Sequence, residues 1–175
     1  LRGYATSIYT TYRSLDKELE ALHFARGMGM SGVIFTMLAH PEDVLEKADR
    51  KLPMVVIGDR RQDLSVDTVE LNNYDAGSLI ARHMHELGHK HLAYISTTLD
   101  EANPIRTQRL QGLRDTFGQL CPEGSVQVKS RDISPETELE NLQIEHLVGR
   151  ELARKCLDDK KITAFVAVND MVAYG

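Results

Sequence analysis

Apolar residues occur along the chain in two patterns, and segments of the two patterns follow one another in turn. Short, nearly continuous apolar runs are typical of strands that are covered on both faces. Between these runs, apolar residues recur at every third or fourth position, as on the buried side of a helix. The predicted strands are residues 4–10, 32–37, 53–58, 65–71, 91–96, 125–130 and 164–168.

Helices are predicted between these strands, and several of them carry recognisable start signals. Ser14 can cap the first helix, and either Asn72 or Asn73 can cap the third. Pro41 and Pro104 suit the first turn of two others. About seven strands and six helices in alternation indicate parallel βαβ units, so the sequence predicts an α/β fold with open parallel sheets flanked by helices.

Polar residues follow three of the predicted strands directly. Asp59 follows the strand at 53–58, and Thr97 and Thr98 follow the strand at 91–96. Asn169 and Asp170 follow the last strand, at 164–168. In an open parallel sheet, ligands bind beyond the carboxyl ends of the strands. These positions are therefore the first candidates for a functional site.

Composition and charge exclude several classes of function for this part of the chain. Hydrophobic residues make up 42% and charged residues 27% of the 175 positions, which is ordinary for a globular protein. The net charge is −5 and the 21 basic residues are scattered, so no nucleic-acid groove is predicted. No apolar run is long enough for a membrane helix. Cys121 and Cys156 lie far apart, and we expect free thiols in a reducing cytoplasm.

Neither a metal centre nor a catalytic site is predicted. Four histidines, His83, His85, His89 and His91, lie close in sequence, but their places on a helix, a turn and a strand direct them apart. The chain has no nucleophile elbow and no glycine-rich phosphate loop. We therefore expect no catalytic residues, no metal and no cofactor. A prediction that the protein is an enzyme would rest on analogy of fold alone.

Five segments of the chain, taken in order, resemble the ligand-binding core of the lactose-repressor/galactose-repressor (LacI/GalR) family of transcriptional regulators. The resemblance covers essentially the whole chain, and the order of the segments makes it specific. The five segments are GVIF (32–35), PMVVIGDR (53–60), RHMHELGHKHLAYIS (82–96), RLQGLRDTF (109–117) and TAFVAVNDMVAYG (163–175).

The resemblance implies a two-lobed core, similar to periplasmic sugar-binding proteins, that is truncated at both ends. Residues 1–71 would belong to the N-terminal lobe and residues 72–175 to the C-terminal lobe, both incomplete. A small-molecule effector, a sugar or sugar phosphate, would bind between the lobes of a cytoplasmic homodimer. Operator DNA would be bound by an N-terminal helix-turn-helix domain that is absent from this chain, and no membrane is involved.

The resemblance also implies particular site residues. Asp170 matches a ligand-hydroxyl acceptor, and Arg109 matches an arginine whose planar fork can grip a diol or a carboxylate. Asn72 falls where many members have aspartate. Asp59 lines the cleft in some members only and is otherwise a loop residue, and Asn169 can orient its loop instead of touching ligand.

Other roles stay open for these residues and for the protein. Asp170 could cap the helix that starts at Met171, Asn72 could be a plain helix cap, and Arg109 could be a solvated residue paired with Asp115 or Glu101. Two other functions are possible for the protein. The first alternative is a periplasmic sugar-binding protein of a transporter, and the second is an α/β enzyme.

Overall fold

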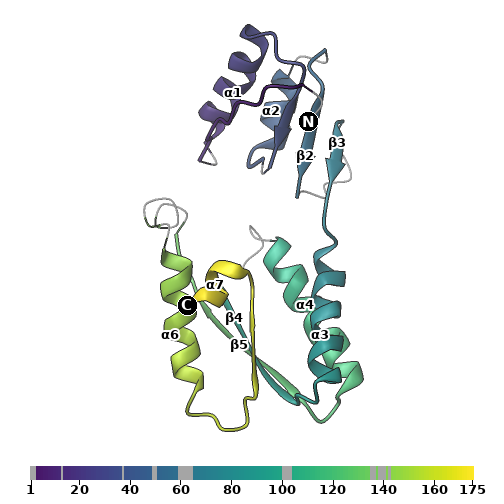
Figure 1. Ribbon diagram of the computed structural model, residues 1–175, viewed down its shortest axis with the longest axis vertical. Helices are drawn as coiled ribbons and strands as arrows, with labels where there is room; N and C mark the ends of the chain where they lie inside the picture. Colours follow the sequence, from purple (N-terminus) through teal and green to yellow (C-terminus); the bar gives the residue numbers. More distant parts are fainter. Residues whose placement is uncertain are drawn as a thin grey trace. The chain divides into compact units, whose positions relative to one another are not determined.

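The computed structural model describes residues 3–12, 14–36, 38–48, 51–58, 65–99, 104–134, 137, 141 and 143–175. The chain divides into two compact units, Leu1–Leu71 and Asn72–Gly175, which are both drawn in Figure 1. Each unit has its own sheet and its own hydrophobic core.

The first unit is a three-stranded parallel sheet in the order β1-β2-β3, with two helices. Val33 pairs with Met54, and Val55 pairs with Asp67, in the two ladders. A small buried core centres on Phe35, Val44 and Val56, among other apolar residues. Its elements are α1 (Leu15–Gly27), β1 (Val33–Phe35), α2 (Pro41–Lys47), β2 (Met54–Ile57) and β3 (Asp67–Val69).

Glu18 of α1 caps α2 from a distance. Its side chain is fully buried, and its two carboxylate oxygens accept hydrogen bonds from the backbone amides of Ala39 (2.9 Å) and His40 (3.2 Å). Those amides lie where α2 begins, and a negative charge is favourable there because of the helix dipole. A polar residue inside an otherwise apolar helix face thus fixes α2 against α1.

The second unit is a parallel sheet in the order β5-β4-β6. Figure 1 shows α3 and α4 on one side of this sheet and α6 on the other. The central strand β4 is buried at every position but the first. The elements are α3 (Asn73–Glu86), β4 (His91–Thr97), α4 (Pro104–Leu120), β5 (Ser125–Arg131), α6 (Ile144–Cys156), β6 (Ala164–Ala167) and α7 (Asp170–Tyr174).

Helices α3 and α4 approach each other closely because two glycines face the opposite backbone. A Cβ atom at Gly77 would lie 2.0 Å from the carbonyl oxygen of Arg109, and one at Gly112 would lie 1.9 Å from that of Tyr74. No side chain fits at such distances. The glycine of the Arg109–Gly112 motif therefore serves packing, and this packing brings the start of α3 next to α4.

The parallel α/β architecture and six of the seven predicted strands are confirmed. The prediction of a strand at residues 4–10 is wrong, because none of these residues lies in a strand. The segment instead runs along α1: the hydroxyl of Tyr9 donates to Glu20 (3.1 Å), and its ring lies 6.1 Å from that of Phe24. Aromatic and β-branched residues are common in strands, but here the segment is exposed and Tyr9 contacts a helix.

Among the described residues, no helix combines the length and the apolar character needed to cross a membrane.

Candidate functional site

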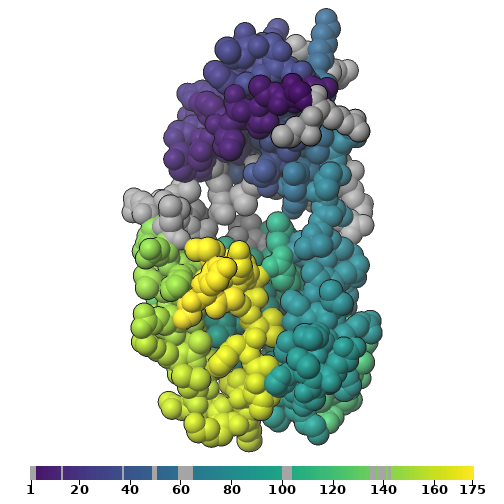
Figure 2. All heavy atoms as spheres, viewed as in Figure 1, coloured from purple at the N-terminus to yellow at the C-terminus, as the bar shows by residue number. Residues whose placement is uncertain are grey.

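The carboxyl edge of the second sheet gathers the ends of its three strands and the starts of the helices that follow them. Strand β4 ends at Thr97, and Val168, Asn169 and Asp170 follow the end of β6. Helices α4 and α6 begin at this same edge, because each leaves the sheet to cross back along one of its faces. The turn after β6 leads directly into α7, which lies at the surface of the unit (Figure 2).

Arg109 is held at this edge by two acceptors from different elements. Its Nη1 donates to the backbone carbonyl of Val168, and its Nη2 donates to Oδ1 of Asn73 at 2.6 Å. The Nε atom is buried and has no hydrogen-bond partner among the described residues. Arg109 is thus partly buried and joins α4 to α3 and to the end of β6. The alternative pairing with Asp115 is wrong, because the guanidinium donates to Val168 and Asn73 and Asp115 instead accepts from the hydroxyl of Tyr74 at 3.1 Å. Glu101, the other alternative partner, lies outside the described residues.

Asn169, and not Asp170, caps α7. Its Oδ1 accepts from the backbone amide of Val172 at 2.9 Å, with the extended backbone expected of an N-cap. Asp170 is the first residue of α7 and is exposed, and its Oδ1 accepts only from the neighbouring amide of Met171 (3.0 Å) within the described part of the chain. The alternative that Asp170 is the cap is therefore wrong, and its carboxylate faces solvent.

Asn72 is the N-cap of α3, as one reading of the sequence had it. Its Oδ1 accepts from the amide of Asp75 at 3.1 Å, and its Nδ2 donates to the Asp75 carboxylate at 2.6 Å. The neighbouring Asn73 is buried and contacts Arg109. Asp59, the remaining predicted site residue, lies outside the described residues.

A charged network at the same edge was not predicted from the sequence. Glu145, in the first turn of α6, accepts from Arg106 (2.8 Å) on one oxygen and from Nδ2 of Asn169 (3.0 Å) on the other. Thr97 lies at the limit of hydrogen bonding to the first oxygen, at 3.5 Å. The side chains of Arg106 and Glu145 are only 15% and 18% exposed. Of these four residues, only Thr97 and Asn169 were singled out, because they follow strands.

Two buried hydroxyls lie on β4 without a hydrogen-bond partner among the described residues, those of Tyr94 and Ser96. Burial raises the pKa of the Tyr94 hydroxyl to about 12, although the positive charges of Arg109 and Arg106 act to lower it. Tyr94 therefore lies within electrostatic reach of both arginines and stays protonated at neutral pH.

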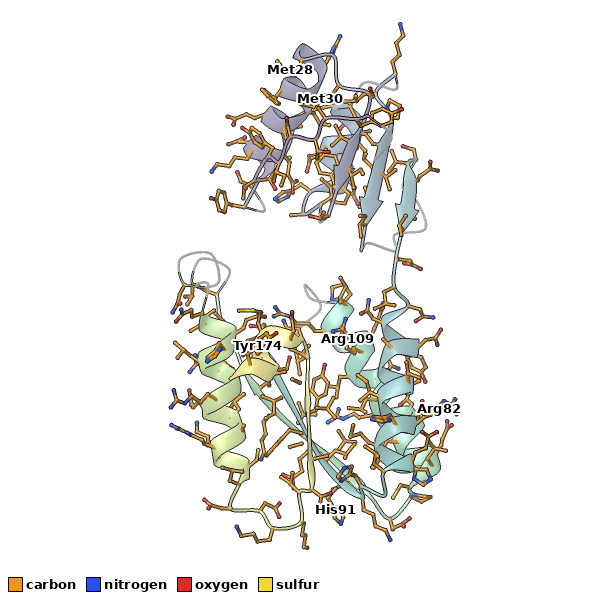
Figure 3. The ribbon with its side chains drawn as sticks, viewed as in Figure 1. Met28, Met30, Arg82, His91, Arg109 and Tyr174 are labelled. Atoms are coloured by element: carbon orange, nitrogen blue, oxygen red, sulfur yellow. The ribbon has the colours of Figure 1, made fainter. Side chains whose placement is uncertain are left out.

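The histidines do not form a metal centre in the described part of the chain, where no group of three or more His, Cys, Asp or Glu side chains converges. His89 Nδ1 lies 2.9 Å from the hydroxyl of Thr163, and His91 Nδ1 lies 3.0 Å from that of Ser125. Figure 3 shows His91 and Arg109 at opposite ends of the second unit. The histidines at the start of β4 are thus remote from the carboxyl edge.

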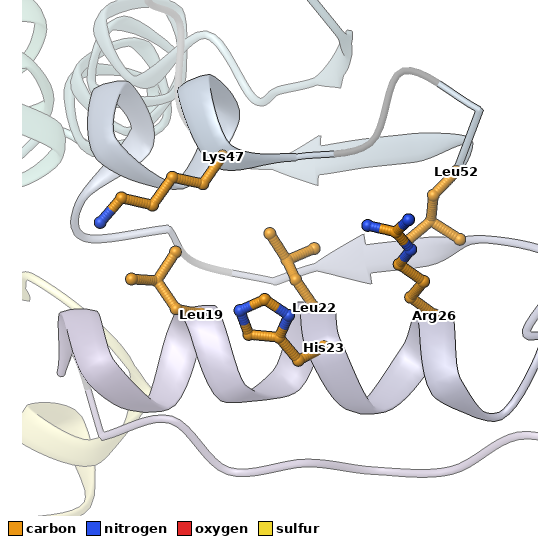
Figure 4. A pocket seen from close by; sticks show the side chains of 6 residues that line it. All are labelled: Leu19, Leu22, His23, Arg26, Lys47 and Leu52. Atoms are coloured by element: carbon orange, nitrogen blue, oxygen red, sulfur yellow. The ribbon is translucent and has the colours of Figure 1, made fainter.

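A small hollow among the described residues of the first unit lies between α1 and the segment that holds α2 and β2 (Figure 4). Its enclosed volume is about 20 Å³, which is close to the space of a single water molecule. It is too small for a metabolite and contains no predicted site residue. Its lining residues are Leu19, Leu22, His23, Arg26, Lys47 and Leu52.

No protein-family model matches the chain. Its sequence is similar, however, to those of curated proteins that are transcriptional regulators. The HTH-type transcriptional regulator DegA of Bacillus subtilis is 27% identical over 179 residues, covering 98% of this chain and 48% of DegA. The HTH-type transcriptional repressor PurR of Mannheimia succiniciproducens is 27% identical over 181 residues, covering 99% of this chain and 49% of PurR. The chain spans about half the length of these relatives.

Solved structures with this fold include both a regulator and a binding protein. A LacI family transcriptional regulator from Enterococcus faecium with bound ribose has a TM-score of 0.65 at 19% identity, covering 90% of this chain and 55% of that one. GanP, a glucose-galactose binding protein from Geobacillus stearothermophilus, has a TM-score of 0.61 at 23% identity, covering 91% and 55%. The predicted periplasmic-binding-protein-like α/β fold is thereby confirmed.

Proposed function

Since the chain has the fold of the effector-binding core of LacI-family regulators and is related in sequence to HTH-type transcriptional regulators, we propose that it is the effector-sensing core of such a regulator. Its ligand is a small polyhydroxylated metabolite of the sugar class. The ligand binds at the carboxyl edge of the second sheet and changes the affinity of the whole protein for its operator DNA.

The observation that carries this proposal is that the exposed residue Asp170 comes two positions after Val168, whose carbonyl accepts a hydrogen bond from the guanidinium of Arg109. A carboxylate accepts strong, charge-assisted hydrogen bonds from hydroxyl groups. A guanidinium has five N–H donors, and two of these are used in the contacts of Arg109. Acceptor capacity at Asp170 and donor capacity at Arg109, at the same edge of the sheet, suit a sugar.

The ligands of two structural neighbours are consistent with this class of effector. Ribose is bound to the Enterococcus faecium regulator, and GanP is described as a glucose-galactose binding protein. These ligands belong to those proteins, and they guide the choice of probes for this one. The sequence relatives DegA and PurR are regulators, which favours a regulator over a transport binding protein or an enzyme for this chain.

Regulation in this proposal follows from linkage between effector and operator binding. An effector shifts a conformational equilibrium only by its difference in affinity for the two states. The family resemblance supplies the other parts of the proposal: a helix-turn-helix domain that reads operator half-sites, a homodimer that fixes their spacing, and a place in the cytoplasm. No cofactor and no turnover of the ligand are part of it.

Calorimetric titration of the purified chain with a panel of sugars tests the proposal. The panel contains ribose, glucose and galactose, each also as its phosphate. We expect one or more of them to bind, and Asp170→Asn to weaken binding by roughly 10- to 100-fold, the loss expected for a hydrogen bond to a charged group. The melting temperature of the unliganded chain should stay nearly unchanged, because Asp170 is exposed and does not cap α7.

Asp158→Asn is the matched control for this titration. Asp158 is also exposed, but it lies in the connection between α6 and β6, away from the carboxyl edge. Its replacement should leave sugar affinity unchanged. The proposal fails when no sugar of the panel binds the wild-type chain, or when Asp170→Asn binds sugar as tightly as the wild type does.

A further inference from the structure

The carboxylate of Glu145 connects four elements at the candidate site. Glu145 lies in α6, and it accepts from Arg106 of α4 and from Asn169 in the turn between β6 and α7. Thr97 at the end of β4 lies 3.5 Å from it. We propose that Glu145 is a positioning residue, which orients Asn169 and thereby fixes Asp170 for effector binding. This inference rests on the proposed function of Asp170.

The side-chain amide of Asn169 can make both of its hydrogen bonds in only one of its two flipped orientations. Its Oδ1 accepts from the amide of Val172 and so caps α7, while its Nδ2 donates to Glu145. The ends of an amide side chain have opposite hydrogen-bonding roles, whereas a carboxylate offers acceptors only. Glu145 therefore selects the orientation in which Oδ1 points to Val172. Asp170, the next residue, takes its position from that cap.

Glu145 is itself held in place by a nearby charge. Arg106 donates to it at 2.8 Å, and the two side chains are 15% and 18% exposed. At this depth, removal of one partner from an ion pair is costly, because the other charge is left without compensation. The pair thus keeps the carboxylate in one place, with its second oxygen turned to Asn169.

A second carboxylate on the same helix offers a natural comparison. Glu151 accepts from Arg131 of β5 at 2.5 Å and from Lys155 of its own helix at 2.6 Å. All three of these side chains are more exposed than Glu145 and Arg106. The contacts of Glu151 do not include the turn after β6. A substitution at Glu151 therefore removes a negative charge from α6 without removing the Glu145–Asn169 contact.

Amide hydrogen exchange at Val172 tests the inference without any ligand. In Glu145→Gln, an acceptor oxygen becomes an NH₂ donor, which faces the Nδ2 donor of Asn169 when the contact with Arg106 is kept. We expect the Val172 amide to exchange about fivefold faster in the unliganded chain, as for the loss of a helix cap. Glu151→Gln should leave this rate unchanged. Glu145→Asp, which keeps the charge but shortens the reach, should raise the rate in the same direction.

Sugar binding then distinguishes positioning from direct contact. We expect Glu145→Gln to weaken binding of the sugars in the panel about threefold to tenfold, and to cause no further loss in the Asp170→Asn background, because residues that act through one another are not additive. An additive loss in the double variant would overturn the inference, as would an unchanged exchange rate at Val172. If the wild-type chain binds none of the sugars, the proposed function is refuted. The role of Glu145 in orienting Asn169 is still tested in that case, by the exchange rate of the Val172 amide.

Discussion

Tyr94 shows how an apolar environment and two arginines act on one side chain. The residue is fully buried in β4, and its hydroxyl has no hydrogen-bond partner in the described part of the chain. Burial raises its pKa to about 12, with Arg109 and Arg106 acting in the opposite direction. An unpaired buried hydroxyl is costly, so this group does not improve the stability of the second unit.

Replacement of Tyr94 by phenylalanine should therefore stabilise the fold slightly at neutral pH, by up to about 1 kcal/mol. The larger effect is expected at alkaline pH. A free tyrosine ionises near pH 10, so the unfolded chain loses this proton at a lower pH than the folded chain does. The contribution to stability that is present below pH ~10 is therefore lost as the pH rises towards 12. The loss amounts to about 2–3 kcal/mol.

Urea unfolding of wild type and Tyr94→Phe at two pH values, one near neutrality and one close to the raised pKa, measures this component. The wild type should lose more stability than the variant between the two values, because the other tyrosines are common to both proteins. Equal losses in both would contradict the account of Tyr94.

Individual site residues were predictable from the sequence only where they follow a strand or belong to a motif. Asn169 and Asp170 were singled out as candidates in this way, and Arg109 through its motif. Asn73 and Glu145 were not, because their contacts join residues far apart in the chain: 36 positions separate Asn73 from Arg109, and 39 separate Arg106 from Glu145. Such contacts depend on how helices cross, which periodicity does not reveal.

The crossing of α3 and α4 shows how two small residues determine the geometry of the site. Gly77 and Gly112 let the two backbones touch, and this contact brings Asn73 within 2.6 Å of Arg109. A similar approach occurs between α6 and α7, where a Cβ at Gly149 would lie 2.1 Å from the carbonyl oxygen of Val172. Helices on both faces of the sheet are thus placed by glycines whose role is packing.

Gly112→Ala should destabilise the second unit by about 1–3 kcal/mol or more, since the added methyl group meets the backbone oxygen of Tyr74 and forces the helices apart. Gly118→Ala on the same helix is the control. A Cβ there has nothing within 4 Å, so alanine should stabilise the helix by about 0.5–1 kcal/mol. Urea unfolding midpoints compare the two variants, and equal effects of the two substitutions would contradict the assigned close packing.

Helices and strands were largely predictable because the hydrophobic pattern reports burial directly. The run at 164–168 gave β6 (Ala164–Ala167), and the segment from Pro104 to about Gln119 gave α4 (Pro104–Leu120). The prediction failed at residues 4–10, which are exposed and lie in no strand, and of which Tyr9 contacts Phe24 of α1. β-Branched and aromatic composition is therefore a weak guide to a strand where no neighbouring strand pairs with the segment.

Considered as a whole, the chain consists of two compact units whose boundary falls between Leu71 and Asn72. Asn72 caps α3 at this boundary, and Asn73 receives the hydrogen bond from Arg109. The candidate site is therefore bonded to the first residues of the second unit.

NMR titration can locate a bound sugar on the chain. Isotope-labelled chain is titrated with ribose, glucose and galactose, and the backbone amide shifts are followed residue by residue. Binding at the carboxyl edge should perturb the amides of Asn169 and Asp170, of Thr97 and Thr98, and of the start of α4. Perturbations confined to the opposite edge of the sheet, around His91 and Ser125, would contradict binding at the carboxyl edge, as would spectra that no sugar changes.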